Sequence, residues 1–362
     1  MIDPHVHLRD GKQSSKETVE HGLEVTYLAG LDGVFEMPNT DPPLISENDL
    51  LARIGLGDEA ACKLRKKYYD FSVFHGVYAG LTPDLRQIRE VVKAQKEHFP
   101  RIVGLKAFFG QSTGNLGITA ENEQRLVWKA VADLGYEGVL AGHCEKESEL
   151  HPDLWDLRKP FTHTLARPPR AEVESIKDQI KFAQAAKYKG TFHVCHVSVP
   201  EALEYIESAR NGLDFQVTCG LTPHHALLYD EMMKQKKGLL LKMNPPLRPR
   251  EMQEYMLRAL LDERIDWIET DHAPHTLDDK INKKQKTYAS GIPVLPFYPH
   301  FINILRKKGM TQETLERLTH DNIANTFRID ALRTIRASDM NLQREYDFDA
   351  FEGLVTYKHL RE

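Results

Sequence analysis

The chain has 362 residues, of which 41% are hydrophobic and 28% charged, a composition typical of a globular protein. Its formal net charge is −5 and its pI about 6.4, which excludes the basic footprint of a nucleic-acid-binding protein. No apolar run reaches the ~18 residues that a membrane-spanning helix needs, so we expect no membrane partner. A single α/β barrel fits the length, because such barrels often run to roughly 200–250 residues or more.

The four cysteines form neither a Cys-x-x-Cys pair nor a disulfide-rich pattern: Cys62, Cys144, Cys195 and Cys219. Reduced thiols of this kind indicate a cytoplasmic protein. A cleavable leader peptide is not expected, because its removal would take away His5 and His7, which are candidate metal ligands.

Short β-rich runs alternate with polar loops and with segments of helical periodicity. The runs expected to form strands are Ile2–His7, Gly33–Met37, Phe71–Tyr78, Ile102–Phe108, Val139–His143, Thr191–Val197, Phe215–Thr218 and Trp267–Thr270. Helical patterns lie between them at Ser15–Leu28, Pro83–Lys96, Glu121–Leu134, Ala171–Lys187, Pro200–Ala209 and Arg250–Leu261. Alternating elements favour parallel strands with right-handed crossovers. The pattern therefore predicts an α/β fold, a (β/α)8 TIM barrel, over residues 1–330.

A doubly wound open sheet is the alternative architecture, and it would gather its site at one switch point of the strand order. Here, instead, most β-rich runs end in a residue that suits a site: His7, Asn39, Lys106, His143, His196 and Asp271. Such a ring is typical of a barrel, whose chemistry lies at the C-terminal ends of many strands. Residues 331–362 are expected to pack outside the barrel or to mediate contacts between subunits, as in a homodimer.

The first β-rich run places a histidine pair at alternate positions, with Arg9 two residues further on. Side chains two apart share a face of a strand, so His5 and His7 point the same way. Two imidazoles one pleat apart are suited to bind zinc. Taken alone, the pair equally fits an edge strand with hydrogen-bonded histidines.

Lys106 lies inside an apolar run, where an ammonium group is costly to bury. The lysine is therefore expected either to pair with a carboxylate or to become a neutral amine. A neutral amine can add carbon dioxide, and the resulting carbamate is an anionic, two-oxygen bridge between metals.

Further candidate ligands end later runs. His143 closes one of them, and His193 and His196 lie three apart in another, so in a regular strand only one of these two enters the barrel. We expect this to be His196, with His193 packed or hydrogen-bonded in the core. Asp271 ends the eighth run, where a carboxylate beside a metal can act as ligand and general base.

This ordered set resembles the amidohydrolase superfamily and, within it, the dihydroorotases. The resemblance extends from residue 3 to about residue 328. It rests on an Asp-x-His-x-His-x-Arg stretch at 3–9, on Met-Pro-Asn at 37–39, and on the blocks 221–225, 242–248 and 270–275.

The resemblance implies two zinc ions per chain, bridged by a hydroxide and by carboxylated Lys106. The other implied metal ligands are His5, His7 and Asp271 for one ion and His143 and His196 for the second. Asp271 would also be the catalytic residue that moves a proton. Many cyclic amidohydrolases carry a β-sandwich built partly from residues before the His-x-His strand. This chain begins at that strand, so we expect a barrel without an N-terminal β-sandwich.

The resemblance also implies a clamp for a substrate carboxylate, formed by Arg9, Asn39 and His275. An arginine beside the histidine pair suits an anionic substrate, because a guanidinium can pair bidentately with a carboxylate. The glycine-containing loop 111–117 would be a lid in which Ser112 or Thr113 donates a hydroxyl, although an ordinary surface turn fits equally well.

The activity implied is that of a zinc-dependent dihydroorotase, which reversibly cyclises N-carbamoyl-L-aspartate to L-dihydroorotate in pyrimidine biosynthesis. Another cyclic amidohydrolase, a dihydropyrimidinase (hydantoinase) or allantoinase, would keep the metals but need no carboxylate clamp. A third alternative is a non-catalytic partner of aspartate transcarbamoylase, and the complete ligand set argues against it.

Overall fold

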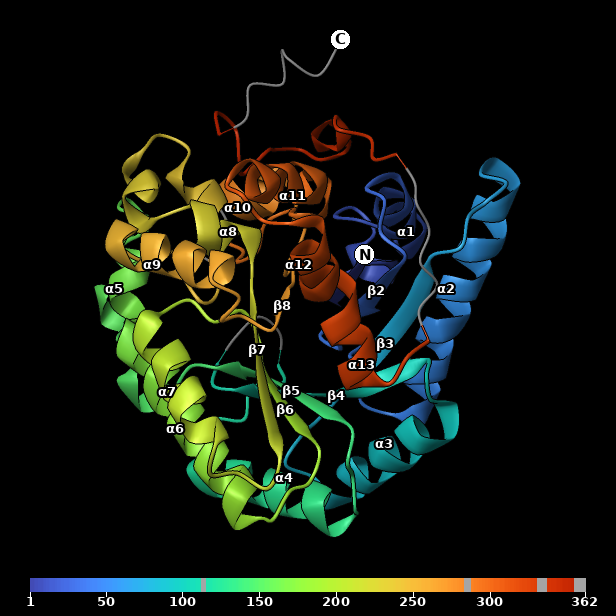
Figure 1. Ribbon diagram of the computed structural model, residues 1–362, viewed down its shortest axis with the longest axis vertical. Helices are drawn as coiled ribbons and strands as arrows, with labels where there is room; N and C mark the ends of the chain where they lie inside the picture. Colours follow the sequence, from blue (N-terminus) through green and yellow to red (C-terminus); the bar gives the residue numbers. More distant parts are fainter. Residues whose placement is uncertain (112–114, 283–287, 331–336, 355–362) are drawn as a thin grey trace.

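The computed structural model describes residues 1–111, 115–282, 288–330 and 337–354 (Figure 1). Eight parallel strands form one sheet in sequence order. They are β1 Ile2–Val6, β2 Gly33–Glu36, β3 Phe74–Gly80, β4 Ile102–Phe109, β5 Val139–Cys144, β6 Thr191–Val194, β7 Gln216–Leu221 and β8 Trp267–Ile268. Beyond β8, His272 forms a bridge with Val6, and its carbonyl accepts the His7 N–H at 2.7 Å, so the sheet closes on itself. The predicted barrel is confirmed.

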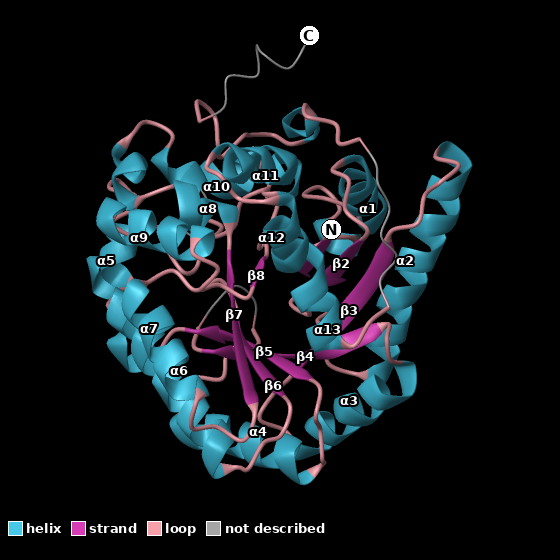
Figure 2. Cartoon of the chain, in the orientation of Figure 1, coloured by secondary structure: helices cyan, strands magenta, loops and turns pink. Residues whose placement is uncertain are grey.

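The helices form an outer layer around the strands (Figure 2). Their bounds are α1 Val19–Leu28, α2 Glu47–Lys67, α3 Leu85–His98, α4 Glu121–Asp133, α5 Thr162–Ala166, α6 Pro169–Ala185, α7 Pro200–Arg210, α8 Pro223–Leu227, α9 Arg250–Leu261, α10 Leu277–Ile281, α11 Tyr298–Lys307, α12 Gln312–Glu316 and α13 Asn322–Phe327. A π-helical turn, Arg317–Asp321, joins the last two. No helix in the described ranges is long and apolar enough to cross a membrane.

Local sequence signals fix where several helices begin. Thr18, Ser46 and Asp84 each accept a backbone N–H of the first turn that follows, which caps α1, α2 and α3. Helices α6 and α7 begin at Pro169 and Pro200, where the fixed φ of proline favours the first turn.

Strands β6 and β8 end well before their predicted ends, and both shortened ends lie at the mouth of the barrel. Strand β6 ends at Val194 and β8 at Ile268. Just beyond them, His196 and Asp271 have φ values of 40° and 49°, in the left-handed region that ordinary residues rarely adopt. The chain therefore leaves the sheet before the residues that line the site.

The hydrophobic core has two layers. The larger layer fills the space between sheet and helices, and a smaller one fills the barrel interior. Phe327 of α13 closes the N-terminal end of the interior, because its ring packs against those of Phe35, Tyr78 and Trp267. The interior is thus packed at one end, and polar residues gather at the other.

Residues 337–354 run over the surface near α1 and α11 (Figure 1). The Phe351 ring stacks on Phe297 with centroids 3.8 Å apart, and the Tyr346 hydroxyl donates to Glu17 at 2.7 Å. The division into a barrel of residues 1–330 and an extension of residues 331–362 stays a prediction.

Candidate active site

The C-terminal ends of the strands enclose a small cavity of about 30 Å³. Its lining brings together residues from most of the strand ends: His5, His7, Arg9, Asn39, Lys106, Phe108, His143, His196, Asn244, Asp271, Ala273, Ser290 and Gly291. All of the predicted metal ligands are among them. The metal-ligand assignments themselves stay predictions.

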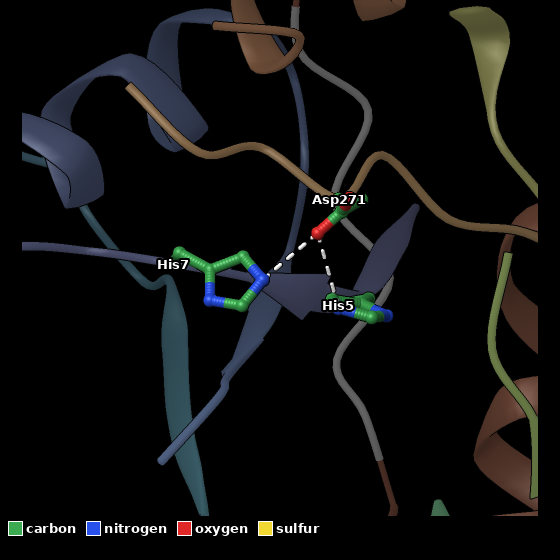
Figure 3. Close-up of side chains that lie close together, drawn as sticks. All are labelled: His5, His7 and Asp271. Carbon is green, nitrogen blue, oxygen red and sulfur yellow. Dashed lines mark hydrogen bonds and ion pairs between the residues drawn. The ribbon is translucent and has the colours of Figure 1, made fainter. Parts of the chain in front are cut away.

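His5, His7 and Asp271 converge on one point of this cavity (Figure 3). The Oδ1 atom of Asp271 lies 2.8 Å from Nε2 of His7 and 3.2 Å from Nε2 of His5. Burial raises the pKa of Asp271, but the two imidazoles outweigh it and hold this pKa well below its usual range. Asn39 Oδ1 accepts from His7 Nδ1 at 2.7 Å, so the Nε2 of His7 faces the aspartate.

His143 and His196 form the second converging pair, with Nδ1 of one 3.2 Å from Nε2 of the other. The opposite nitrogen of His143 lies 2.9 Å from a carboxylate oxygen of Glu145, which in turn pairs with Arg167. Glu145 therefore orients His143, an arrangement that commonly supports metal-binding histidines. Burial, followed by the neighbouring His143, lowers the pKa of His196 well below its ordinary value.

Lys106 is fully buried, and among the described residues no carboxylate lies within 4 Å of its amine. The amine donates to Sγ of Cys195 at 3.0 Å and lies 5.0 Å from the ring centroid of Phe108. Although burial raises the pKa of Cys195, the Lys106 amine and His5 lower it to about 5. The alternative in which Lys106 pairs with a carboxylate therefore has no support among the described residues.

The expectation that only one of His193 and His196 enters the barrel is wrong. Both side chains reach the barrel interior, because His193 follows the inward alternation of β6, whereas His196 lies beyond the strand and turns inward through its positive φ. His193 lies 2.9 Å from Glu269, 3.1 Å from the Thr218 hydroxyl, and stacks on Trp267. It is a hydrogen-bonded core histidine, as predicted, but inside the barrel.

The donor set fits divalent cations. Nε2 of His7 and Oδ1 of Asp271 converge on a point that also faces His5. Nδ1 of His143 and Nε2 of His196 face each other at 3.2 Å, and only one of these two nitrogens can carry a proton in a hydrogen bond between them. The Nδ1 atom of His196 is buried without a hydrogen-bond partner in the described residues. Imidazole nitrogen and carboxylate oxygen are the usual catalytic ligands of zinc.

Arg9 lines the same cavity and is 3% exposed. Its Nε donates to the Pro274 carbonyl at 3.4 Å, and no carboxylate of the described chain lies within 4 Å of it, Asp10 included. Burial lowers its pKa, although Glu17, Glu36 and Asp271 oppose the shift. A buried guanidinium without a carboxylate partner is suited to bind an anionic ligand.

The remaining predicted substrate residues are less directly placed. His275 does not line the cavity, since its Nε2 lies 3.1 Å from the Ser290 carbonyl, one layer behind Gly291. Ser112 and Thr113 lie outside the described residues. Sequence reasoning missed Asn244 and Ser290, which do line the cavity. Asn244 belongs to a motif block that the resemblance had singled out without assigning it a role.

A closed parallel barrel that presents two histidine pairs, a lysine and an aspartate at its strand ends defines the metal-dependent amidohydrolase class. The chain is 31% identical over 333 residues to dihydroorotase of Methanothermobacter thermautotrophicus, which covers 90% of this chain and 69% of that relative. It is 32% identical over 360 residues to dihydroorotase of Pediococcus pentosaceus, covering 96% and 78%. The chain belongs to the dihydroorotase family.

Solved structures share the fold. L-hydantoinase from Arthrobacter aurescens superposes with a TM-score of 0.77 at 22% identity, covering 90% of this chain and 70% of that one. Dihydroorotase from Campylobacter jejuni superposes with a TM-score of 0.64 at 19% identity, covering 91% and 83%. No family model matches the chain.

Proposed function

We propose that the protein is a zinc-dependent dihydroorotase that interconverts N-carbamoyl-L-aspartate and L-dihydroorotate. The observation that carries this proposal is Arg9, a buried cation without a carboxylate partner among the described residues, in the same cavity as His5, His7 and Asp271. The carboxylate of dihydroorotate would complete that pair, whereas a neutral cyclic amide would leave the guanidinium desolvated and unpaired.

Two zinc ions would be held by the predicted ligands, one by His5, His7 and Asp271 and one by His143 and His196, with carboxylated Lys106 between them. When bound, such ions polarise a carbonyl group and lower the pKa of water towards neutrality. Carboxylation is supported by the burial of Lys106 away from any described carboxylate, because it turns a costly buried cation into an anionic ligand.

Asp271 would move the proton of the reaction. In the hydrolytic direction, the oxygen of water bonds to the ring carbonyl carbon while the Asp271 carboxylate takes a water proton. The carbon–nitrogen bond of the ring then breaks, and Asp271 delivers the proton to the departing nitrogen. In the biosynthetic direction the same steps run backward and release water.

Arg9 would hold the substrate carboxylate, with Asn39 and Asn244 beside it in the cavity lining. We include His275 in this clamp because its ring adjoins Gly291 at the cavity edge. The hydroxyls of Ser112 and Thr113 remain predicted contacts. A carboxylate fixed there would place the ring amide next to Asp271.

We also propose that the enzyme works in the cytoplasm, which the four free cysteines support. Assembly as a homodimer stays a prediction. The second candidate activity, hydrolysis of a neutral cyclic amide, is favoured by the fold shared with hydantoinases. Arg9 argues against it, because such a substrate offers no anion.

The test is a turnover assay on purified, metal-analysed protein with dihydroorotate, hydantoin and allantoin as parallel substrates. We expect dihydroorotate to be preferred, activity to disappear when a chelator removes the metal, and zinc to restore it. A wild-type enzyme that prefers hydantoin or allantoin would replace this proposal with the second candidate.

A further inference from the structure

A second group of potential metal ligands lies deeper in the barrel than the substrate cavity. His5, Cys195 and Glu269 are all buried, and one ligand atom of each lies within 4.8 Å of those of the other two. Cys195 and Glu269 belong to neither predicted zinc site, and neither lines the cavity. The group therefore needs a separate explanation.

The spacing of His5 and Glu269 is that of two ligands on one ion. Nδ1 of His5 lies 3.6 Å from Oε1 of Glu269, which is too long for a hydrogen bond, and this nitrogen has no other partner among the described residues. Two donor atoms at ~2.0–2.1 Å from a tetrahedral zinc ion lie roughly 3.4 Å apart. The gap thus has the size that a shared cation fills.

Neighbouring groups hold the Glu269 carboxylate in this orientation. Its Oε2 atom lies 2.9 Å from Nε2 of His193 and accepts from the Trp267 indole at 3.2 Å. Its Oε1 atom accepts the backbone N–H of His196. Supporting contacts of this kind commonly fix the ligands of a metal.

Strand β7 leaves room for this carboxylate. A Cβ added to Gly220 would lie 2.4 Å from the Glu269 carboxylate carbon. Glycine at position 220 therefore permits a buried acidic side chain from the next strand to reach His5. Any larger residue there would displace Glu269 from the group.

We propose that His5, Cys195 and Glu269 form a third divalent-cation site, for zinc or another thiophilic ion. The proposal rests on the proposed function, because His5 would present Nε2 to the ion shared with His7 and Asp271 and Nδ1 to this one. Imidazole nitrogen, thiolate sulfur and carboxylate oxygen are all established zinc ligands. Cys195 and Glu269 lie outside the lining of the substrate cavity, so the ion would hold His5 from the side of the core.

Charge and proton balance support the site. The Lys106 amine lies 3.0 Å from Cys195 Sγ, and carboxylation would remove that positive charge. A cation in the third site replaces it beside the thiol and Glu269. Binding releases the Nδ1 proton of His5 and any thiol proton to solvent, because only the deprotonated groups are ligands.

The experiment measures metal content and the absorption of the cobalt-substituted protein. Elemental analysis after dialysis against metal-free buffer is expected to give three ions per chain in the wild type. The Cys195→Ser and Glu269→Gln variants are expected to lose one ion each. The cobalt protein is expected to show a near-ultraviolet cobalt–thiolate band, which both variants lose. Cys144→Ser, which changes another buried thiol, is the matched control and keeps the ions and the band.

Two ions in the wild type with no thiolate band would overturn the third site, even if dihydroorotate is turned over. Loss of every ion in Glu269→Gln would also overturn it, because Glu269 would then only position His5. Three ions and a thiolate band without dihydroorotate turnover would uphold the site and reject the proposed function instead. If Cys195→Ser does not fold, the wild-type band and its loss in Glu269→Gln decide the question.

Discussion

The two ends of the barrel differ in the volume of their hollows and in the residues that line them. The larger hollow lies at the N-terminal ends of the strands, whereas the predicted catalytic residues line the smaller one. The N-terminal ends of β6, β7 and β8 border a hollow of about 780 Å³, whereas the cavity at the C-terminal ends has about 30 Å³. In the larger hollow, Arg210 pairs with Asp266 and Lys189 lies 3.2 Å from Asp214. These charges are satisfied by one another.

The small cavity instead collects buried basic groups that no carboxylate of the described residues pairs with. Arg9 and Lys106 are buried cations without a carboxylate, and the Nδ1 of His196 lacks a partner. Burying such groups is costly, so a fold keeps them only where something else completes them. Buried basic groups without a carboxylate partner, rather than the volume of the hollow, identify the functional end of this barrel.

The largest expected effect comes from Lys106→Ala. If the carbamate bridges two ions, the variant should lose metal, and activity should fall to the assay background. Short carboxylic acids at millimolar concentration should restore part of the activity by replacing the bridge. Metal content and turnover are measured on the same preparation. Near wild-type activity would exclude the bridging role.

Lys280 provides the matched control, because it is the other fully buried lysine named here. Its amine donates to the backbone carbonyls of Lys242, Ala289 and Gly291. Lys280→Met should therefore lower the free energy of unfolding while the protein retains its metal. The contrast separates a lysine held by three backbone carbonyls from one whose amine donates to a thiol in the candidate site.

Asp271→Asn should have the next largest effect on turnover. A general acid–base group contributes ~100- to 10,000-fold to the rate, and the amide of asparagine can neither accept nor return the proton. The variant is checked by its kcat for dihydroorotate. Retention of more than about a tenth of the wild-type rate would contradict the assigned role.

The sequence predicted the strands better than the helices. All eight strands lie where the β-rich runs predicted, because apolar β-rich runs between polar loops are a strong signal. Helix α2 was missed, although its apolar positions Leu50, Ile54 and Leu64 lie on one buried side. Its long, charged outer surface dilutes that pattern, and the Ser46 cap was the available signal.

The candidate site was predictable as far as strand order carries it. Residues within regular strands, such as Lys106 and His143, lie in the cavity as alternation predicts. Alternation failed for His193 and His196, because the positive φ of His196 redirects its side chain and no residue pattern encodes that angle. Glu269 was missed for another reason: its contacts come from β1, β6 and β7, which only the folded barrel brings together.

Arg9→Ala tests which substrate completes the cavity. The variant should keep its metal but lose ~30-fold or more in kcat/KM for dihydroorotate, because removing one member of a buried charge pair costs about 2–5 kcal/mol. An uncharged cyclic amide should show no comparable loss, which makes it the internal control. Unchanged dihydroorotate turnover would refute the carboxylate clamp.

Glu17 tests whether buried charge near the mouth also governs stability. It lies 3.3 Å from His272 and 3.2 Å from His21 and accepts from Tyr346. Burial raises its pKa, but His272 and His21 outweigh it and lower the pKa from 4.5 to about 2. The contribution of ionised Glu17 to the free energy of unfolding is therefore present above pH 4.5 and lost as the pH falls towards 2.

Urea unfolding of Glu17→Gln checks this pH dependence. The shift corresponds to at most about 3 kcal/mol at neutral pH, and the gap between wild type and variant should narrow as the solution is acidified. A gap that stays constant between neutral and acid pH would show that the ionised carboxylate is not the source of the stability.

The smallest effect is expected at the opposite end of the barrel, from Asp266→Asn. Both side chains of the Arg210–Asp266 pair are partly exposed, and such ion pairs typically contribute ~0.2–1 kcal/mol. Asparagine keeps an oxygen for the Cys219 N–H, which Asp266 accepts at 2.7 Å, so the local backbone is preserved. The free energy of unfolding should therefore change only slightly, and kcat/KM for dihydroorotate should match that of the wild type. A loss of kcat/KM comparable with that of Arg9→Ala would mean that the large hollow acts on the reaction, and the contrast between satisfied and unsatisfied charge would no longer separate the two ends.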